Sequence, residues 1–342
     1  MRKLFCTALI CVAAFAKAQD ANFSQFFASP LTLNPALTGK FDGDFRVAGN
    51  YRNQWPTINN AFTTYTASFD IGIMKNRIPE FDQFGIGVMA FSDKAASGIL
   101  QNNYIGASIS YHKALDENGF NQLGAGFQAT YASKQLNVYR KDVYFLDQLR
   151  ANGFTGATAE VFDGQNLNLS YFDINAGVLY TRSTDGNNNF YVGASMYHIT
   201  RPQESHIKEA PRDLAYYLPS RLTLQAGGFV PINEYDAFHF SAIHSRQAGA
   251  VNTTLGGAFM KNVNANPESP TNVYLGSWFR FGDAVIPYVG LEFNSLRIGY
   301  TYDVNISSLK PGSNMRGGTE ISLIYVKPYV DPNRRKLNCP RF

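Results

Sequence analysis

Histidines are the side chains of this chain best suited to metal binding or acid–base chemistry. The sequence holds five of them, His112, His198, His206, His239 and His244. Their spacing does not match the i, i+4 pattern of a zinc-binding helix, and no pair of cysteines accompanies them. The stretch 185–189 lacks the spaced acidic ligands and final Glu of a calcium loop. The sequence therefore predicts no metal ion and no cofactor.

His239 and Ser241 form the one pair that invites comparison with a hydrolase that uses a Ser–His couple. They lie two residues apart on an apparent strand, which places both side chains on one face. Such side chains stand about 7 Å apart, too far for the hydrogen bond between nucleophile and base. We expect the protein not to be an enzyme, with a barrel hydrolase as a minor alternative.

The composition is aromatic and poor in charge. Of the 342 residues, 45% are hydrophobic and 14% aromatic but only 16% charged, against about 25% in a typical soluble domain. After the first twenty residues, no apolar run reaches the ~18 residues that a transmembrane helix requires. These features exclude a helical membrane protein.

Residues 1–18 have the organisation of a secretory signal peptide. A basic start at Met1–Lys3 precedes an apolar core, and Ala16-Lys17-Ala18 matches a signal-peptidase site. We predict cleavage before Gln19. A lipoprotein anchor at Cys11 is the less favoured alternative, because the apolar core continues beyond it.

Removal of the signal peptide changes the charge and the cysteine content. Without Arg2, Lys3 and Lys17 the chain has 27 basic and 26 acidic residues, so the formal charge falls from +4 to about +1. This balance gives no reason to expect nucleic acid as a partner. Only Cys339 remains, so the mature chain cannot form an internal disulfide.

Apolar and polar residues alternate with a period of two, which is typical of half-buried strands. In the clearest case Leu123, Phe127 and Tyr131 share one face with two alanines, while glycine, Gln128 and Thr130 occupy the other. The same pattern predicts fourteen strands, near 44–53, 64–73, 83–92, 100–112, 123–131, 171–181, 188–198, 219–230, 235–244, 249–260, 270–281, 284–293, 296–302 and 316–326.

Strand length and number both fit an outer-membrane barrel. About ten residues at ~3.3 Å each and a tilt of ~45° span roughly 23 Å, close to the ~25 Å apolar band of such barrels. Alternation alone also fits a large soluble β protein, but the low charge and the aromatic strand ends favour lipid. We predict an all-β transmembrane barrel over 42–326, an N-terminal periplasmic or plug segment over 19–41, and a tail over 327–342.

The connections have the asymmetry of an outer-membrane barrel, with short periplasmic turns and longer external loops. With a periplasmic N-terminus, loops 133–170, 199–219 and 304–315 all fall outside. The connection 261–270 is longer than a usual periplasmic turn and is the one exception.

Several motifs resemble the PorP/SprF family of Bacteroidetes outer-membrane proteins. They are Gln25–Gly39, which contains Asn34-Pro35, then Tyr51–Trp55, His198–Pro202, Leu218–Arg221, Arg297–Asp303, Gly317–Leu323 and the terminal Cys339-Pro340-Arg341-Phe342. The resemblance covers essentially the whole mature chain. It implies an outer-membrane component of the type IX secretion system, which also serves gliding motility in that phylum.

The resemblance also implies partners. Family members are thought to work with secreted proteins that carry a C-terminal sorting domain, including large surface adhesins, and some with periplasmic ring components. No catalytic residue carries over. Asn34, Pro35, Gln54 and Trp55 match family motifs and are expected to be structural, with Trp55 in an aromatic belt at the external end of the first strand.

From these points we predict a barrel that binds and anchors, or helps to export, a secreted surface protein. The charged loop 199–219 ends in aromatic residues, a composition that suits a protein-binding surface. Its candidate contact residues are Arg201, Glu204, His206, Tyr216 and Tyr217. A passive or gated solute channel of the porin type is the main alternative, because a fourteen-stranded barrel has room for a path through it.

Overall fold

The computed structural model describes residues 20–58, 61–74, 77–138, 146–150, 153–154, 158–159, 167–184, 187–204, 216–264, 270–329 and 339–340. The proposed signal peptide, His206 and most of the connection 137–167 lie outside these residues. No helix in the described ranges is long and apolar enough to cross a membrane.

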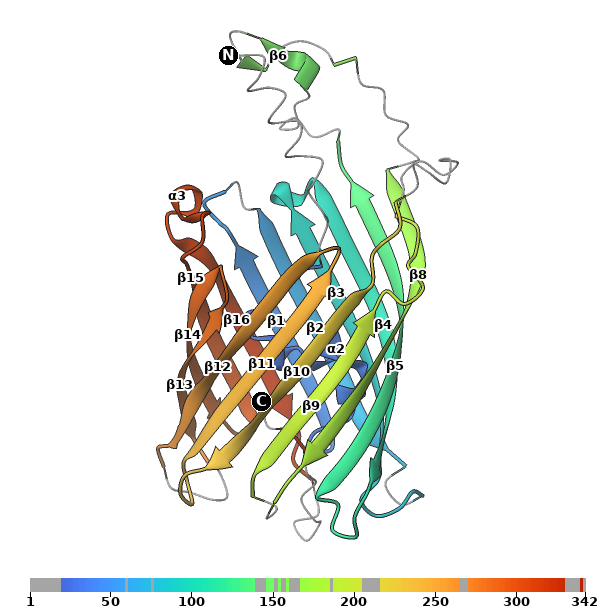
Figure 1. The fold of residues 1–342 in the computed structure, drawn as a ribbon, viewed down its shortest axis with the longest axis vertical. Helices are drawn as coiled ribbons and strands as arrows, with labels where there is room; N and C mark the ends of the chain where they lie inside the picture. The colour runs from blue at the N-terminus through green and yellow to red at the C-terminus, as the bar shows by residue number, and fades with distance from the viewer. Residues whose placement is uncertain are drawn as a thin grey trace.

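Fourteen antiparallel strands form one closed barrel, as the alternation predicted (Figure 1). The strands are β1 (Phe45–Gln54), β2 (Phe62–Ile73), β3 (Gln83–Ala95), β4 (Leu100–Ala114), β5 (Asn121–Leu136), β8 (Asn168–Arg182), β9 (Asn189–Tyr197), β10 (Arg221–Pro231), β11 (Ala237–Gln247), β12 (Ala250–Asn262), β13 (Asn272–Arg280), β14 (Ala284–Phe293), β15 (Leu296–Asn305) and β16 (Arg316–Val326). Each pairs with its neighbour in the chain, and β1 closes the barrel against β16.

The connection between β5 and β8 differs from the prediction. Pairing of these strands continues to Gln135 and Asn168, so the predicted loop 133–170 is shorter at both ends. It contains the two-residue strands β6 (Leu149–Arg150) and β7 (Gly153–Phe154), which pair only with each other. The long connections lie together at one end of the barrel, which we describe as the external end (Figure 1).

The two faces of the wall have the polarity of a membrane barrel. Large apolar side chains such as Ile105 and Phe172 point outward and are 66% and 76% exposed. Polar side chains such as Asp70, Gln128 and Glu320 point inward and are buried. This arrangement is the reverse of a soluble β protein, in which the apolar faces would meet in a core.

The N-terminal segment, residues 20–44, lies inside the barrel before it joins β1 (Figure 1). It contains the 3-10 turns η1 (Phe26–Ala28) and η2 (Pro35–Leu37) and the short helix α2 (Pro30–Leu33). Its backbone and side chains hydrogen-bond to lumen-facing side chains on different parts of the wall, including those of β4, β9 and β16. The segment supplies nine of the 26 buried hydrophobic residues in the part of the chain that the structure describes, among them Phe26, Leu31 and Leu37.

Lumen glycines leave the space that this segment occupies. A Cβ on Gly126 would lie 2.4 Å from the carbonyl carbon of Pro35, and a Cβ on Gly85 would lie 2.3 Å from the carbonyl oxygen of Thr38. The polar-face glycines of the alternating strands thus have a packing reason, because backbone approaches backbone at these points.

Candidate functional site in the lumen

The Asn34-Pro35 motif fixes the turn in the middle of the N-terminal segment. Asn34 is fully buried, and its Oδ1 accepts a hydrogen bond from the amide of Ala36 at 2.8 Å. Its Nδ2 donates to the carbonyl oxygens of Val178 in β8 and Ala194 in β9, at 3.1 and 3.3 Å. One amide side chain therefore caps the turn and ties it to two strands of the wall.

The second motif pair lies at the external end of β1. Gln54 is the last residue of that strand, and Trp55 follows with a positive φ of 54°. The amide of Trp55 donates to the carbonyl of Gly317 at 2.9 Å, and its ring packs edge-on against Phe62 at 5.7 Å. The turn thus joins the external end of β1 to the start of β16.

A buried network of charges anchors the start of the N-terminal segment. Ser24 Oγ donates to Asp303 and accepts hydrogen bonds from Arg52 and Arg280, at distances between 2.7 and 2.8 Å. The backbone amides of Ser24 and the following residue donate to the two carboxylate oxygens of Glu320, at 2.7 and 3.1 Å. Removing one member would leave a buried charge without its partner, which is strongly destabilising.

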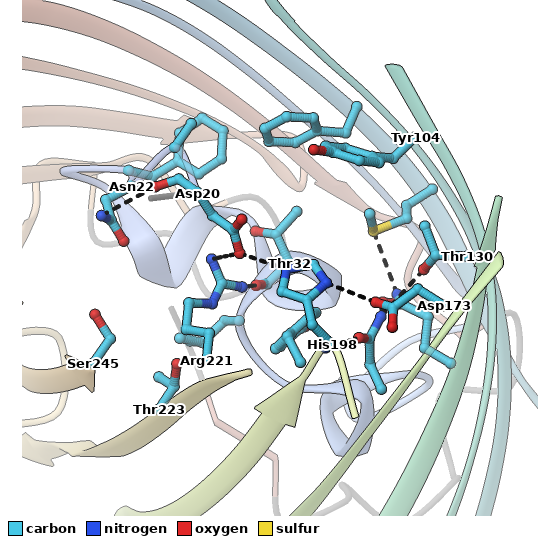
Figure 2. Close-up of a pocket in the computed structure, with 18 of the residues that line it drawn as sticks. Asp20, Asn22, Thr32, Tyr104, Thr130, Asp173, His198, Arg221, Thr223 and Ser245 are labelled. Carbon is cyan, nitrogen blue, oxygen red and sulfur yellow. Dashed lines mark hydrogen bonds and ion pairs between the residues drawn. The ribbon is translucent and has the colours of Figure 1, made fainter. Parts of the chain in front are cut away.

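A second charged cluster holds residue 20 near the external end. His198 hydrogen-bonds Asp20 through Nε2 and Asp173 through Nδ1, both at 2.8 Å, and Arg221 pairs with Asp20 at 3.1 Å. Figure 2 shows His198 between the two carboxylates, with Arg221 on the other side of Asp20. The cluster joins the N-terminal segment to the ends of β9 and β10.

Mutual attraction sets the charge state of this cluster. Burial alone lowers the pKa of His198, but the Asp20 and Asp173 carboxylates outweigh that effect and raise it to about 9. Burial raises the pKa of Asp20, yet His198 and Arg221 hold it well below its usual range. At neutral pH His198 therefore carries a positive charge and Asp20 a negative one, and the two attract each other.

A cavity lies against this cluster in the external half of the lumen (Figure 2). Its empty space is about 870 Å³, part of it open to solvent. One wall carries Phe91 and Tyr104, whose rings are 5.2 Å apart, and the floor carries Phe23 of the N-terminal segment. The remainder of that segment runs from the floor toward the opposite end of the barrel.

The candidate partner residues of loop 199–219 have different environments. Arg201 is exposed, with a positive φ of 47°, and Tyr216 and Tyr217 are 41% and 42% exposed. Glu204 is buried, where it accepts a hydrogen bond from Tyr171 at 2.6 Å and pairs with Lys134 at 2.9 Å. The exposed three offer contact surface, whereas Glu204 braces the loop against β5 and β8.

The suspected hydrolase pair is not assembled. Ser241 Oγ accepts the indole hydrogen of Trp278 at 2.9 Å, and the His239 ring stacks on Phe229 at 5.5 Å. In the described residues there is also no cluster of three or more potential metal ligands of the His, Cys, Asp or Glu type. In the lumen, Ser241 forms a hydrogen bond and His239 packs against an aromatic ring.

Sequence reasoning missed both charged clusters. His198 lies 178 positions from Asp20, and Ser24 lies 279 positions from Asp303. Nothing in the spacing of such residues shows that they meet, because their proximity depends on where the N-terminal segment crosses the lumen. The available signal was the period-two pattern, which puts Asp173, Asp303 and Glu320 on the polar faces of their strands and could have indicated that they face the lumen.

Comparison with known proteins gives a family and a fold. A family model described as "Type IX secretion system membrane protein PorP/SprF" matches residues 15–325. Among curated protein sequences, none matches this chain.

Solved structures show the same kind of barrel. The "TodX deltaS2S3 mutant monoaromatic hydrocarbon channel" aligns with a TM-score of 0.50 and 10% identity, over 86% of this chain and 92% of that one. The toluene transporter TbuX of Ralstonia pickettii (TM-score 0.47, 10% identity, 87% and 91% covered) and a Pseudomonas aeruginosa FadL homologue (TM-score 0.47, 12% identity, 85% and 92% covered) are also similar. At 10% identity, the likeness to the TodX mutant supports the fold alone.

Proposed function

Because the chain belongs to the PorP/SprF family of type IX secretion system membrane proteins, we propose that it binds and anchors a secreted surface protein at the outer membrane. The partner class that we propose is an exported protein, such as an adhesin, with a C-terminal sorting domain. A role in gliding motility is part of the same proposal.

The observation that carries this proposal is the N-terminal segment held across the lumen. The segment is bonded to both sides of the wall by Asn34, Ser24 and Asp20, each of which makes several polar contacts. A barrel with this occupant is better suited to presenting a surface than to conducting solutes. The surface available for an exported partner is the external end, where the long connections gather.

The base of loop 199–219 is built to hold such a surface. Gln203 and Tyr217 form a β-bridge, and the amide of Glu204 donates to the carbonyl of Tyr216 at 2.8 Å. The pairing of Glu204 with Lys134 fixes this base to β5. Tyr216 and Tyr217 are thereby exposed on a braced turn, and exposed tyrosines are enriched where proteins bind proteins.

The test is recovery of the partner with the barrel. The full-length protein carries an affinity tag in the turn 263–271, at the end opposite the loop, and is purified from native outer membranes in mild detergent. The triple change Arg201→Ser, Tyr216→Ser and Tyr217→Ser should lower the amount of co-purified secreted protein at least tenfold, as measured by quantitative mass spectrometry. Glu204 is left intact so that the base of the loop persists.

Tyr235→Ser is the matched control. Tyr235 is 40% exposed and lies in the turn 232–236 at the opposite end of the barrel. Deletion of 202–217 is the larger change and should abolish recovery. Undiminished recovery in the triple variant and in the deletion would contradict the docking proposal, and co-purification of periplasmic ring components alone would move the binding surface to the other end.

A further inference from the structure

Aromatic side chains form one wall of the external cavity of the lumen. Phe23 packs edge-on against Phe91 at 6.3 Å, and Phe91 packs against Tyr104 at 5.2 Å. Met89, Leu33 and Ile243 also line the cavity. Apolar surface in contact with water is unfavourable, so this wall favours an apolar occupant over water.

The charged side chains beside the cavity are already matched to one another. Asp20 pairs with His198 and Arg221, and Asp173 pairs with His198. Lys134 and Glu204, the nearest pair on the Tyr171 side, also neutralise each other. A carboxylate or an ammonium group in the cavity would meet no free counter-charge among these groups, so the site suits an uncharged molecule.

The wall opposite the aromatic rings offers polar groups. Thr223, Ser245 and Asn252 line it from β10, β11 and β12. The hydroxyl and amide groups of these three side chains can donate hydrogen bonds to an oxygen atom of an occupant.

The size of the space limits what can fill it. The empty space of about 870 Å³ includes open solvent, so only the part enclosed by the lining side chains is available, and the occupant must be small. The N-terminal segment lies beneath it, so access is from the external end. On the described residues, β9 pairs with β8 only as far as Ala176.

We propose that this cavity binds a small uncharged molecule with an aromatic or short aliphatic body and one oxygen acceptor. The body packs on Phe91 and Tyr104, and the oxygen accepts a hydrogen bond from the polar wall formed by Thr223, Ser245 and Asn252. Figure 2 shows Tyr104 across the open space from Arg221 and His198. The occupant would also contact Phe23, so binding would stabilise the start of the N-terminal segment.

Binding is measured by ¹⁹F NMR relaxation of 4-fluorobenzyl alcohol with the purified full-length barrel in detergent. Ala21→Phe fills the cavity from its floor, since Ala21 lines it and is only partly buried. Ala129→Phe adds the same side chain to an exposed position on the lipid face and is the control. We expect saturable binding to the native protein and to Ala129→Phe, and at least tenfold weaker binding to Ala21→Phe.

Two further probes test the ligand class. The charged 4-fluorobenzoate should bind at least tenfold more weakly than the alcohol, and 4-fluorotoluene, which has no oxygen, should also bind more weakly. Ser245→Phe fills the cavity from β11 and replaces Ala21→Phe if that variant fails the heat-modified gel shift of a folded barrel. Equal uptake by the native protein, the filled variant and detergent alone would overturn the proposal, as would tighter binding of the benzoate.

Discussion

At the scale of single residues, buried charged side chains hold the N-terminal segment and the end of β9 in place. His198 has a positive φ of 58°, a conformation that is uncommon for residues other than glycine and asparagine. Bonds to Asp20, Asp173 and the hydroxyl of Ser220 hold it there. A strained backbone that is fixed by several partners often marks a functional position, and here it ends β9 beside the cavity.

The charge state of His198 predicts how stability depends on pH. Its pKa is raised from 6.5 to about 9, so the folded barrel holds the proton more tightly than the unfolded chain does. This contribution is complete below about pH 6.5 and is lost as the pH rises through 9. We expect the midpoint of thermal unfolding to fall between pH 7 and pH 10 in the native protein.

His198→Asn is the variant that isolates this effect, because asparagine tolerates a positive φ and does not titrate. It should lower the stability at pH 7 by an amount on the order of 1–3 kcal/mol and give a flatter pH profile than the native protein. The measurement is the midpoint of heat-induced loss of the compact gel band at each pH. If the thermal midpoints of the two proteins changed with pH in parallel, His198 would not be the source of the pH dependence of stability.

At the scale of elements, alternation was sufficient for the wall but not for what lies within it. Polar and apolar residues of β5 alternate without interruption, so its existence and its two faces were readable from the sequence. The segment around Asn34-Pro35 has no such period. Its path depends on glycines such as Gly85 and Gly126, which come together with it only after the barrel closes.

The glycine at position 126 supplies a test of this packing. Gly126→Ala would place a methyl group 2.4 Å from the backbone of Pro35, and such overpacking costs about 1–3 kcal/mol. We expect a lower thermal midpoint and faster protease cleavage within 23–41. Gly49→Ala is the control, since its nearest neighbour would be the carbonyl oxygen of Thr66 at 3.5 Å. Equal behaviour of the two variants would mean that the segment is not held by close backbone contact.

At the scale of the whole molecule, the fold class and the family could be predicted from the sequence, whereas the lumen sites could not. The fourteen strands follow from local periodicity, which each strand contains by itself. The meeting of Asp20 with His198, or of Ser24 with Asp303, is a property of the closed barrel with its occupant. The candidate loop residues Tyr216 and Tyr217 were found by composition, and their role in partner binding remains a prediction.

The same occupant decides between a docking barrel and the porin alternative. Residues 20–41 lie across the lumen and bond to strands around the wall, so the native protein in a planar bilayer should show little or no conductance. Deletion of 20–41 should produce large conductance steps if the barrel still assembles, because a fourteen-stranded barrel then has an open lumen. Gly126→Ala, with the segment displaced but present, should give smaller and noisier steps, while Gly49→Ala should stay closed. Stable conductance by the native protein, unchanged by the deletion, would favour a solute channel and would mean that the segment does not close the path.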